Sequence, residues 1–340
     1  MISPTKRGAI FDNTQVFAED WVPGDFECRD SQLNLMASAL EPIIHDGYAN
    51  GLLLYGPSGT GKTSSSRYLL GKLREHSFEL ETAHVNCWSD YTRYRILHRI
   101  VDELPTENAH RHSRSAGTLR DTLHDYEPPI VVLLDEADQI GEIEIFYDLY
   151  ELPNLEVIVT ANDPHEVYVG LEDRIRSRMT SLQEVKFDPY SVDELESILD
   201  QRVKHGLQPG VISTELVRKI ADEAEGNARD AITALKSSAQ LAVEDRADEI
   251  QDEHVEQAMS MVSENIRQQA LERLNKHQQT LFELVRDNRE IAPRDLYQKY
   301  ESQVDDPRSE RTVRKYLRKL EQYDLVTSNG SSQTKRYHVA

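Results

Sequence analysis

The sequence has little cysteine and no long hydrophobic run. Its two cysteines, Cys28 and Cys87, fit neither a disulfide framework nor a metal-ligand spacing, which excludes a disulfide-stabilised secreted domain. The longest apolar runs, residues 51–55 and 130–134, fall far short of the roughly 20 residues that a membrane helix needs. No signal segment, charged and then apolar, opens the chain. We therefore expect a soluble, cytoplasmic protein without a membrane partner.

Basic residues are also scarce. The chain has 39 lysines and arginines against 60 acidic residues, which gives a formal net charge of −21. This balance resembles that of proteins from halophilic archaea, because acidic surfaces stay soluble in concentrated salt. Such a negative field repels nucleic acid at low salt, so any DNA-binding site must depend on a local concentration of basic residues.

A glycine-rich motif follows the first apolar run. Residues 56–63 read Gly-Pro-Ser-Gly-Thr-Gly-Lys-Thr and lead into a helical pattern, so the predicted order is strand, P-loop, helix. In such a loop the backbone N–H groups surround the β-phosphate, and the helix N-terminus adds partial positive charge. We expect Lys62 to reach the β- and γ-phosphates and Thr63 to ligate Mg²⁺. The candidate residues for ATP or ADP here are Pro57, Ser58, Gly59, Thr60, Gly61, Lys62, Thr63 and Ser64.

Two further apolar strands end in polar residues. Residues 130–134 run into Asp135 and Glu136, which predicts two carboxylates at the C-terminal edge of a parallel sheet, where α/β folds place ligands. We expect Asp135 to hold Mg²⁺ and Glu136 to orient and deprotonate the attacking water. Residues 157–160 precede Asn162, whose amide either contacts the water or the γ-phosphate, or only begins a turn.

These segments resemble one branch of the AAA+ ATPases, the archaeal initiators related to origin recognition complex subunits and to the cell division control helicase loader. The resemblance extends over nearly the whole chain. Besides the nucleotide site, matching segments are residues 16–17 (Val-Phe), 21–23 (Trp-Val-Pro), 92–95 (Thr-Arg-Tyr-Arg), 171–178 (Leu-Glu-Asp-Arg-Ile-Arg-Ser-Arg) and 226–230 (Gly-Asn-Ala-Arg-Asp).

The resemblance implies roles for three arginines. It places Arg229 on a helix of a small lid, where contact with the nucleotide couples the lid angle to nucleotide state. It makes Arg174 or Arg178 an arginine finger that acts on the ATP of a neighbouring copy. The sequence does not decide which of these two arginines is the finger. The alternative for both is a place on a solvated basic helix.

The resemblance also implies an adenine pocket and a DNA-contacting insertion. Val22, Pro23 and Arg29 are the candidates for the pocket, although residues 26–32 depart from the Pro-x-Arg-like turn that the family usually has. The insertion is expected within residues 88–126, with residues near 111–120 contacting DNA and an exposed helical hairpin as the alternative.

The remainder of the chain is predicted to be mostly helical. A capping box at residues 191–194 begins a helical pattern that continues near residues 213–225 and 228–246 and matches the small lid. Beyond it, three amphipathic helices and a β-hairpin make a winged helix. Their predicted bounds are 276–287, 293–302 and 309–323 for the helices, and 325–327 and 336–339 for the strands.

Basic residues concentrate in the last of these helices and in the hairpin. Residues 308–336 hold eight basic and three acidic residues, a local balance of +5. We expect the helix to enter the major groove and the hairpin tip to reach the minor groove; a protein-binding winged helix is the alternative. The candidate DNA contacts are Arg308, Arg311, Thr312, Arg314, Lys315, Arg318, Asn329, Gly330, Lys335 and Arg336.

The predicted fold class is an α/β P-loop AAA+ ATPase domain with a small α-helical lid, followed by a C-terminal winged-helix domain. The expected bounds are 1–187, 188–263 and 264–340. The expected function is that of an ATP-dependent replication initiator, a slow ATPase that binds origin duplex DNA, helps recruit or load the replicative helicase, and meets other copies or paralogues on DNA. The alternative is an ATP-binding winged-helix regulator or plasmid-maintenance factor with little turnover.

Overall fold

The computed structural model describes residues 10–18, 21–24, 26, 28–45, 51–76, 80–105, 115–168, 171–272, 274–322, 325–330 and 335–339. The chain forms two compact units, Met1–Val255 and Glu256–Ala340. The boundary between them falls inside helix α11 (Asp252–Glu272), as does the predicted boundary at residue 263. The separation of the first unit at residue 187 stays a prediction. Among the described helices, none is long and apolar enough to span a bilayer.

The centre of the first unit is a parallel sheet in the order β2-β3-β4-β1-β5. Its strands are β1 (Leu52–Tyr55), β2 (Glu81–Asn86), β3 (Ile130–Asp135), β4 (Leu155–Ala161) and β5 (Gln183–Lys186). The three apolar runs of the sequence are thus β1, β3 and β4. Because β3 is buried along its whole length, it reads as a continuous apolar run rather than an alternating one. These three strands are neighbours, so the residues that follow them share one edge of the sheet.

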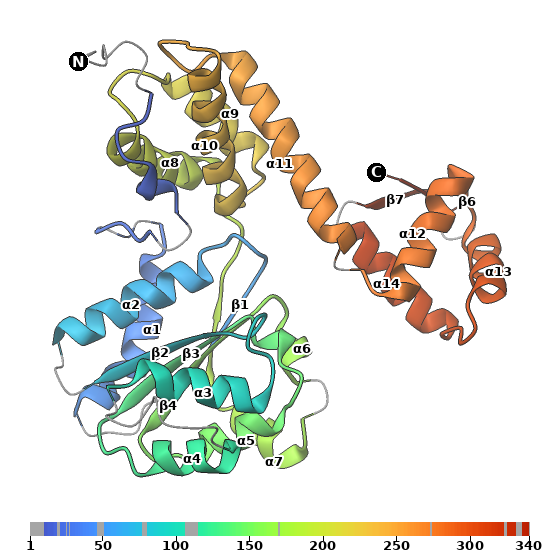
Figure 1. The fold of residues 1–340 in the computed structure, drawn as a ribbon. Coiled ribbons are helices and arrows are strands. Elements are labelled where there is room, and N and C mark those ends of the chain that lie inside the picture. Colours follow the sequence, from blue (N-terminus) through green and yellow to red (C-terminus); the bar gives the residue numbers. More distant parts are fainter. Residues whose placement is uncertain are drawn as a thin grey trace, which may run out of the picture. The chain divides into compact units, whose positions relative to one another are not determined.

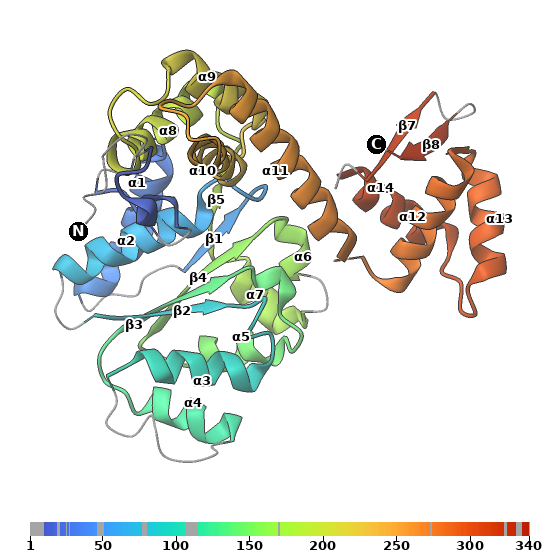
Figure 2. The same ribbon diagram turned by 45° about the horizontal axis from the view of Figure 1, so that its top comes forward.

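Helices cover both faces of this sheet (Figure 2). On one face lie α1 (Asp30–Leu40) and α2 (Lys62–His76); on the other lie α3 (Arg93–Glu103), α4 (Ala116–His124), α5 (Glu144–Tyr150), α6 (Pro164–Tyr168) and α7 (Asp173–Met179). Strand alternation divides the core accordingly, since Leu52 and Leu54 pack with α1 and α2 whereas Leu53 packs on the opposite face. Each fully buried leucine contributes on the order of 2 kcal/mol.

The predicted lid consists of α8 (Val192–Gly206), α9 (Thr214–Glu223) and α10 (Ala228–Glu244). The predicted capping box at the start of α8 is confirmed: Ser191 accepts a hydrogen bond from the Glu194 amide, and the Glu194 side chain accepts one from the Ser191 amide. On the apolar face of α8, Leu195 and Leu199 are fully buried.

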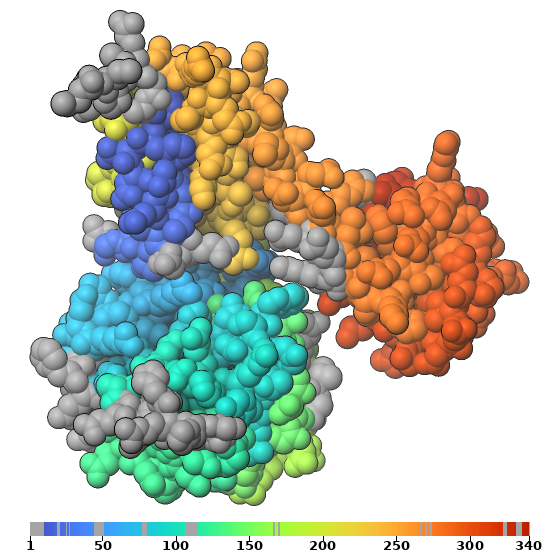
Figure 3. Space-filling model, in the orientation of Figure 1, coloured from blue at the N-terminus to red at the C-terminus, as the bar shows by residue number. Residues whose placement is uncertain are grey.

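The N-terminal segment, residues 10–18, is attached to the lid rather than to the sheet (Figure 1). The amides of Asp12 and Asn13 donate to the carbonyl of Gly206 at 2.9 and 3.1 Å, and Phe11 forms a β-bridge with Leu207. Figure 3 shows the dark-blue atoms of this segment against the yellow atoms of the lid. The short helix η1 (Thr14–Phe17) therefore lies beside α8, although the two helices are far apart in the sequence.

The second unit contains α12 (Lys276–Asn288), α13 (Pro293–Gln303) and α14 (Glu310–Gln322) and an antiparallel sheet in the order β6-β8-β7. Its strands are β6 (Glu290–Ile291), β7 (Val326–Asn329) and β8 (Arg336–Val339). Leu281, Leu296 and Leu317, one from each helix, meet in a single core. The three predicted helices and both hairpin strands are confirmed. The sequence did not predict β6, because two residues are too short to show an alternating pattern.

Candidate functional site

A cavity of about 250 Å³ lies in the first unit at the C-terminal edge of the sheet. The structure brings the P-loop, the ends of β3 and β4, and the lid together around it. From the sequence-predicted set, the cavity is lined by Pro23, Ser58, Gly59, Thr60, Gly61, Lys62, Thr63, Ser64, Asp135, Glu136, Asn162 and Arg229. Pro57, Val22 and Arg29 do not line it.

At the end of the P-loop, the Lys62 side chain turns back and contacts the backbone of the loop. The ammonium donates to the carbonyls of Gly56 and Pro57 at 2.6 and 2.8 Å and lies 3.5 Å from the amide oxygen of Asn162. Burial lowers the pKa of Lys62 to about 8, although the nearby carboxylates of Asp135 and Glu136 act in the opposite direction. Lys62, expected at the β- and γ-phosphates, and Asn162, for which contact with the γ-phosphate is one of the expected roles, therefore lie close to each other.

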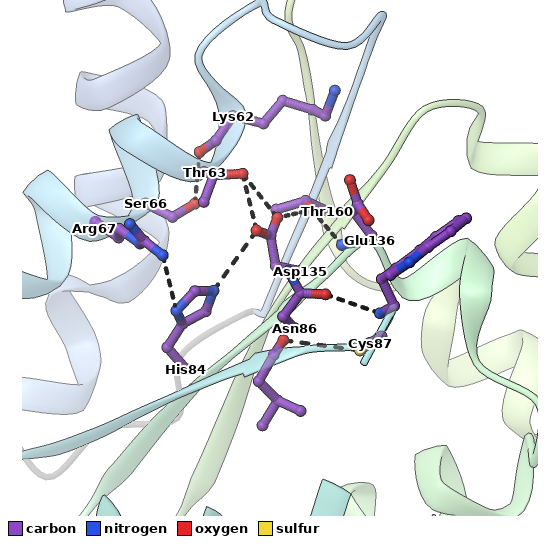
Figure 4. Close-up of polar contacts among 12 residues, drawn as sticks. Lys62, Thr63, Ser66, Arg67, His84, Asn86, Cys87, Asp135, Glu136 and Thr160 are labelled. Atoms are coloured by element: carbon purple, nitrogen blue, oxygen red, sulfur yellow. Dashed lines mark hydrogen bonds and ion pairs between the residues drawn. The ribbon is translucent and has the colours of Figure 1, made fainter. Parts of the chain in front are cut away.

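Asp135 is the centre of a hydrogen-bonded cluster (Figure 4). The Thr63 hydroxyl lies 2.8 and 3.0 Å from its two carboxylate oxygens, and the Thr160 hydroxyl donates to one of them at 2.6 Å. His84 Nε2 lies 3.6 Å from the other oxygen. Burial alone would raise the pKa of Asp135, but the contacts with His84, Thr160 and Thr63 prevail and hold it below its usual range. An ionised carboxylate beside a hydroxyl is a donor set that suits Mg²⁺.

The tautomer of His84 follows from its second neighbour. Arg67, on α2, places Nη2 3.4 Å from His84 Nδ1. Because a guanidinium can only donate, Nδ1 must accept, and the ring proton of the neutral imidazole is then on Nε2, toward Asp135. The sequence did not predict this contact, since nothing in a single strand indicates which histidine faces the next strand's carboxylate.

Glu136 has an unusual backbone conformation. Its φ and ψ of 57° and 47° are left-handed, which costs a non-glycine residue on the order of 1 kcal/mol. The Glu136 amide donates to the Thr160 hydroxyl at 3.0 Å, and the side chain lines the cavity. Such backbone strain is concentrated at functional sites in proteins. Thr160 therefore contacts both predicted acidic residues, a role that the sequence did not assign to it.

The end of the cavity remote from Asp135 is largely aromatic and aliphatic. Its walls come from the N-terminal part of the chain and from the lid, and such a lining suits a flat heterocyclic base. Arg202 of α8 lies over the Trp21 ring, 4.0 Å from its centroid. The additional lining residues at this end are Phe17, Ala18, Trp21, Phe26, Ile198, Gln201, Arg202, Ile232 and Thr233.

The adenine-pocket prediction needs correction at two positions. Val22 and Arg29 lie outside the cavity, and only Pro23 of the three candidates lines it. Arg29 begins α1 and turns behind the P-loop, where Nε donates to the Thr60 carbonyl at 3.1 Å. The aromatic residues Phe17 and Trp21 were quoted for the resemblance but were not predicted as site residues.

The lid reaches the P-loop through the first residues of α10. Asn227 caps this helix by accepting from the amides of Arg229 and Asp230. The Ala228 amide donates to the carbonyl of Gly59 at 3.0 Å, so the helix begins directly on the loop. Gly59 has a φ of +74°, and a Cβ there would lie 1.7 Å from the Asn227 side chain. Arg229, one residue further, lines the cavity as predicted.

The other predicted functional residues of this unit lie away from the cavity. Arg174 and Arg178 are exposed on α7, where Arg174 lies over the Tyr147 ring and Arg178 donates to the Tyr150 carbonyl. Residues 111–114 of the predicted DNA-contacting insertion lie outside the described residues. Arg120, its last residue, belongs to α4 and pairs with Glu151 at 3.0 Å.

In the second unit, α14 exposes its predicted basic residues on one side and buries Val313, Leu317 and Leu320 on the other. The exposed residues of the predicted set are Arg308, Arg311, Arg314, Lys315, Arg318, Asn329, Gly330 and Arg336, and Thr312 is half-buried. Lys335 is partly engaged within the unit, since its ammonium lies 3.3 Å from Glu321 and over the Tyr337 ring.

Two segments of the chain match known domain families. Residues 45–179 match the AAA domain, and residues 196–260 match the Cdc6 AAA+ ATPase-type lid domain. These segments contain the P-loop with the acidic strand end, and the lid helices, respectively.

Relatives are similar over nearly the full chain. The ORC1-type DNA replication protein 9 of Halobacterium salinarum is 38% identical over 329 residues, which cover 96% of this chain and 93% of the relative. The ORC1-type DNA replication protein 1 of the same organism is 35% identical over 304 residues, or 89% and 99% of the two chains.

Solved structures share the fold. The Aeropyrum pernix ORC1 protein in complex with DNA superposes with a TM-score of 0.75 at 23% identity, over 97% of this chain and 94% of that one. The Aeropyrum pernix ORC2 protein, solved as ADPNP-ADP complexes, gives a TM-score of 0.71 at 20% identity, over 98% and 94%.

Proposed function

The chain belongs to the ORC1-type DNA replication proteins, and from this membership we propose that it is an ATP-dependent initiator that binds origin duplex DNA. It helps to recruit or load the replicative helicase, and nucleotide state is the switch. The observation that carries the proposal is the convergence of Lys62, Asp135, Glu136 and Asn162 with the lid residue Arg229 on one cavity. The three proposed domains are residues 1–187, 188–263 and 264–340.

The site fits ATP with Mg²⁺. We assign the phosphates to the P-loop and Lys62, and the base to the aromatic end of the cavity beside Phe17 and Trp21. Thr63 and Asp135 are the residues that would hold Mg²⁺, because both present hard oxygen donors and the low pKa of Asp135 keeps it ionised. When bound, Mg²⁺ supplies positive charge that offsets the charge developing on the phosphate oxygens.

Hydrolysis is assigned to residues at the ends of β3 and β4. Glu136 accepts a proton from the attacking water, and Asn162 orients that water or the γ-phosphate. The backbone of Glu136 is held in place by the Thr160 hydroxyl. In this scheme Arg174 or Arg178 of a second copy contributes the arginine finger, and a missing finger costs 10³-fold or more in rate. A single copy is therefore expected to turn over ATP slowly.

The lid provides the switch in this proposal. Arg229 is a cation at the start of a helix that begins on the P-loop, so a change at the γ-phosphate alters a contact between lid and loop. Such a contact can shift a two-state equilibrium only by its difference in free energy between the states, typically 1–3 kcal/mol.

DNA binding is assigned to the second unit. Three helices and an antiparallel sheet with a hairpin support a winged helix, in which α14 enters the major groove and the hairpin the minor groove. DNA is the partner that a protein of this fold holds in the Aeropyrum pernix ORC1 complex. Exposed Arg311, Arg314, Lys315 and Arg318 supply the local positive charge that the acidic chain otherwise lacks.

The test is duplex binding by the intact protein in concentrated KCl, with chromosome fragments as ligands, in ATP and in ADP. The Glu136→Gln variant is measured alongside, because we expect it to bind ATP but to hydrolyse it much more slowly. Tight binding confined to an origin fragment and altered by nucleotide supports the initiator. Nucleotide-independent binding to many scattered fragments contradicts it and supports an ATP-binding regulator or plasmid-maintenance factor.

A further inference from the structure

Two buried arginines that the hydrolysis scheme does not use contact different parts of the nucleotide site, Arg29 the P-loop and Arg202 the wall beside Trp21. Arg29 is 4% exposed and Arg202 is 8% exposed. Each guanidinium donates to two main-chain carbonyls and lies over an aromatic ring. The two arginines therefore make the same kind of contacts at different places.

Arg29 connects the P-loop to the segment between β5 and α8. Its Nε donates to the Thr60 carbonyl at 3.1 Å and its Nη2 to the Asp188 carbonyl at 2.7 Å. The guanidinium carbon lies 3.7 Å from the centroid of the Tyr190 ring. A planar guanidinium holds two acceptors at a fixed separation, which a lysine ammonium does not do. Arg29 therefore fixes how far the outer side of the P-loop lies from the connection to the lid.

Tyr190 extends this contact to the lid. Its ring stands so close to the loop that a Cβ on Gly61 would lie 2.3 Å from the phenol oxygen. The Tyr190 amide donates to the Gly226 carbonyl at 3.0 Å, immediately before the residues that begin α10. Arg29, Tyr190 and the lid turn therefore contact the P-loop together, and Tyr190 also lines the cavity.

Arg202 has the corresponding place at the other end. One of its terminal nitrogens donates to the Val16 carbonyl, and the other lies 3.4 Å from the Trp21 carbonyl. The guanidinium covers the Trp21 ring at 4.0 Å, and both side chains line the cavity. Burial lowers the pKa of Arg202 to about 10, so the side chain stays charged near neutral pH. It joins the N-terminal segment to α8 and fixes the position of Trp21.

We propose that Arg29 and Arg202 are positioning residues for the two ends of the bound nucleotide. Arg29 holds the P-loop in the shape that receives the phosphates, and Arg202 holds Trp21 in the place that receives the base. The inference rests on the proposed ATP binding and deepens it. The effects of the two arginines on binding can therefore be distinguished with ligands that carry only the phosphate end or only the base end of ATP.

The experiment measures the affinity of the intact protein for ATP, inorganic tripolyphosphate and adenosine, by competition with a fluorescent ATP analogue in Mg²⁺-free concentrated KCl. Arg29→Gln is expected to weaken the binding of ATP and of tripolyphosphate by roughly 10- to 100-fold, the range for losing a charge-assisted hydrogen bond. The affinity of this variant for adenosine should be unchanged. Arg202→Gln is expected to weaken the binding of ATP and of adenosine and to leave the affinity for tripolyphosphate unchanged.

Two further variants control for charge and for general loss of structure. Arg74→Gln removes an arginine that donates to the Thr82 carbonyl at 2.9 Å, away from the cavity, and should change none of the affinities. Arg29→Lys keeps the charge but not the paired donors, and should behave like Arg29→Gln. Equal effects on tripolyphosphate and adenosine in either glutamine variant, or no effect at all, would overturn the inference. Absence of ATP binding in the unsubstituted protein would instead refute the proposed function itself.

Discussion

The hydroxyl of Thr160 lies 2.6 Å from a carboxylate oxygen of Asp135, and the same hydroxyl accepts a hydrogen bond from the amide of the next residue, Glu136. One side chain on β4 therefore positions both acidic residues at the end of β3. The contact also joins the two strands whose ends carry the predicted metal ligand and the predicted water-orienting amide. The spacing between Asp135 and Asn162 thus depends on a residue that has no direct role in the chemistry.

We expect Thr160→Val to lower ATP hydrolysis by roughly 10-fold or more, because it removes one of the hydrogen bonds to the buried Asp135 carboxylate and the partner of the Glu136 N–H. ATP affinity should change much less, since the P-loop is untouched. Steady-state phosphate release and equilibrium nucleotide binding would measure the two effects. Thr160→Ser retains the hydroxyl and should keep most of the activity; equal loss in both variants would contradict the explanation.

Glu136→Gln should lower the hydrolysis rate by about 10²- to 10⁴-fold, the usual contribution of a general base, while ATP remains bound. A single-turnover assay with radiolabelled ATP separates binding from cleavage. The matched control is Glu144→Gln, an exposed residue on α5 outside the cavity, which should hydrolyse ATP normally. Near-normal hydrolysis by Glu136→Gln would show that another group activates the water.

The low pKa of Lys62, about 8 in place of 10.5, predicts that ATP affinity falls as the pH rises through 8. The reason is that phosphate binds the protonated ammonium, which the free protein loses above that pH. The effect on folding has the opposite sign. Between pH 8 and 10.5 the unfolded chain binds more protons at Lys62 than the folded chain does, so the contribution of Lys62 to the unfolding free energy rises with pH. Lys62→Arg stays protonated, and its nucleotide affinity should show no such slope.

Charge reversal on α14 should abolish duplex binding. Arg314→Glu with Arg318→Glu replaces two exposed cations by anions, and fluorescence anisotropy with labelled duplex measures the loss. Each lost phosphate contact should also reduce the slope of log affinity against log salt by about 0.9. Arg286→Glu, on the exposed side of α12, reverses one charge away from α14 and should leave duplex binding nearly unchanged. Unchanged binding in the double variant would refute the assignment of α14 to DNA.

The sequence predicted those parts of the site that depend on local pattern. A P-loop is a contiguous motif with a strand before and a helix after it, and the position of Asp135 follows from an apolar strand that ends there. The apolar periodicity of the helices and the Ser191 capping box likewise depend on residues three or four positions apart, so α8, α12, α13 and α14 were predicted well, whereas α11 was not predicted.

What the sequence did not predict depends on contacts between distant residues. Arg29 was expected in the adenine pocket, but its partner carbonyl on Asp188 is 159 positions away and no periodicity indicates it. The carbonyl of Val16 accepts from Arg202 over 186 positions. Because any backbone carbonyl can accept such a bond, the residue types alone carry no sign of the pairing. The same holds for Thr160, which reads as one more β-branched residue in an apolar strand.

The attachment of the N-terminal segment to α8 also determines an order of events during synthesis. Asp12 pairs with the Gln208 side chain, 196 positions later, so the ribosome has translated the whole parallel sheet before this partner exists. The strands β1, β3 and β4, whose ends carry the P-loop, the acidic residues and Asn162, precede α8 in the chain, whereas the wall beside Trp21 includes α8 itself. The nascent chain therefore contains the strand ends that we assign to phosphate before it contains the helix that completes the wall beside the base.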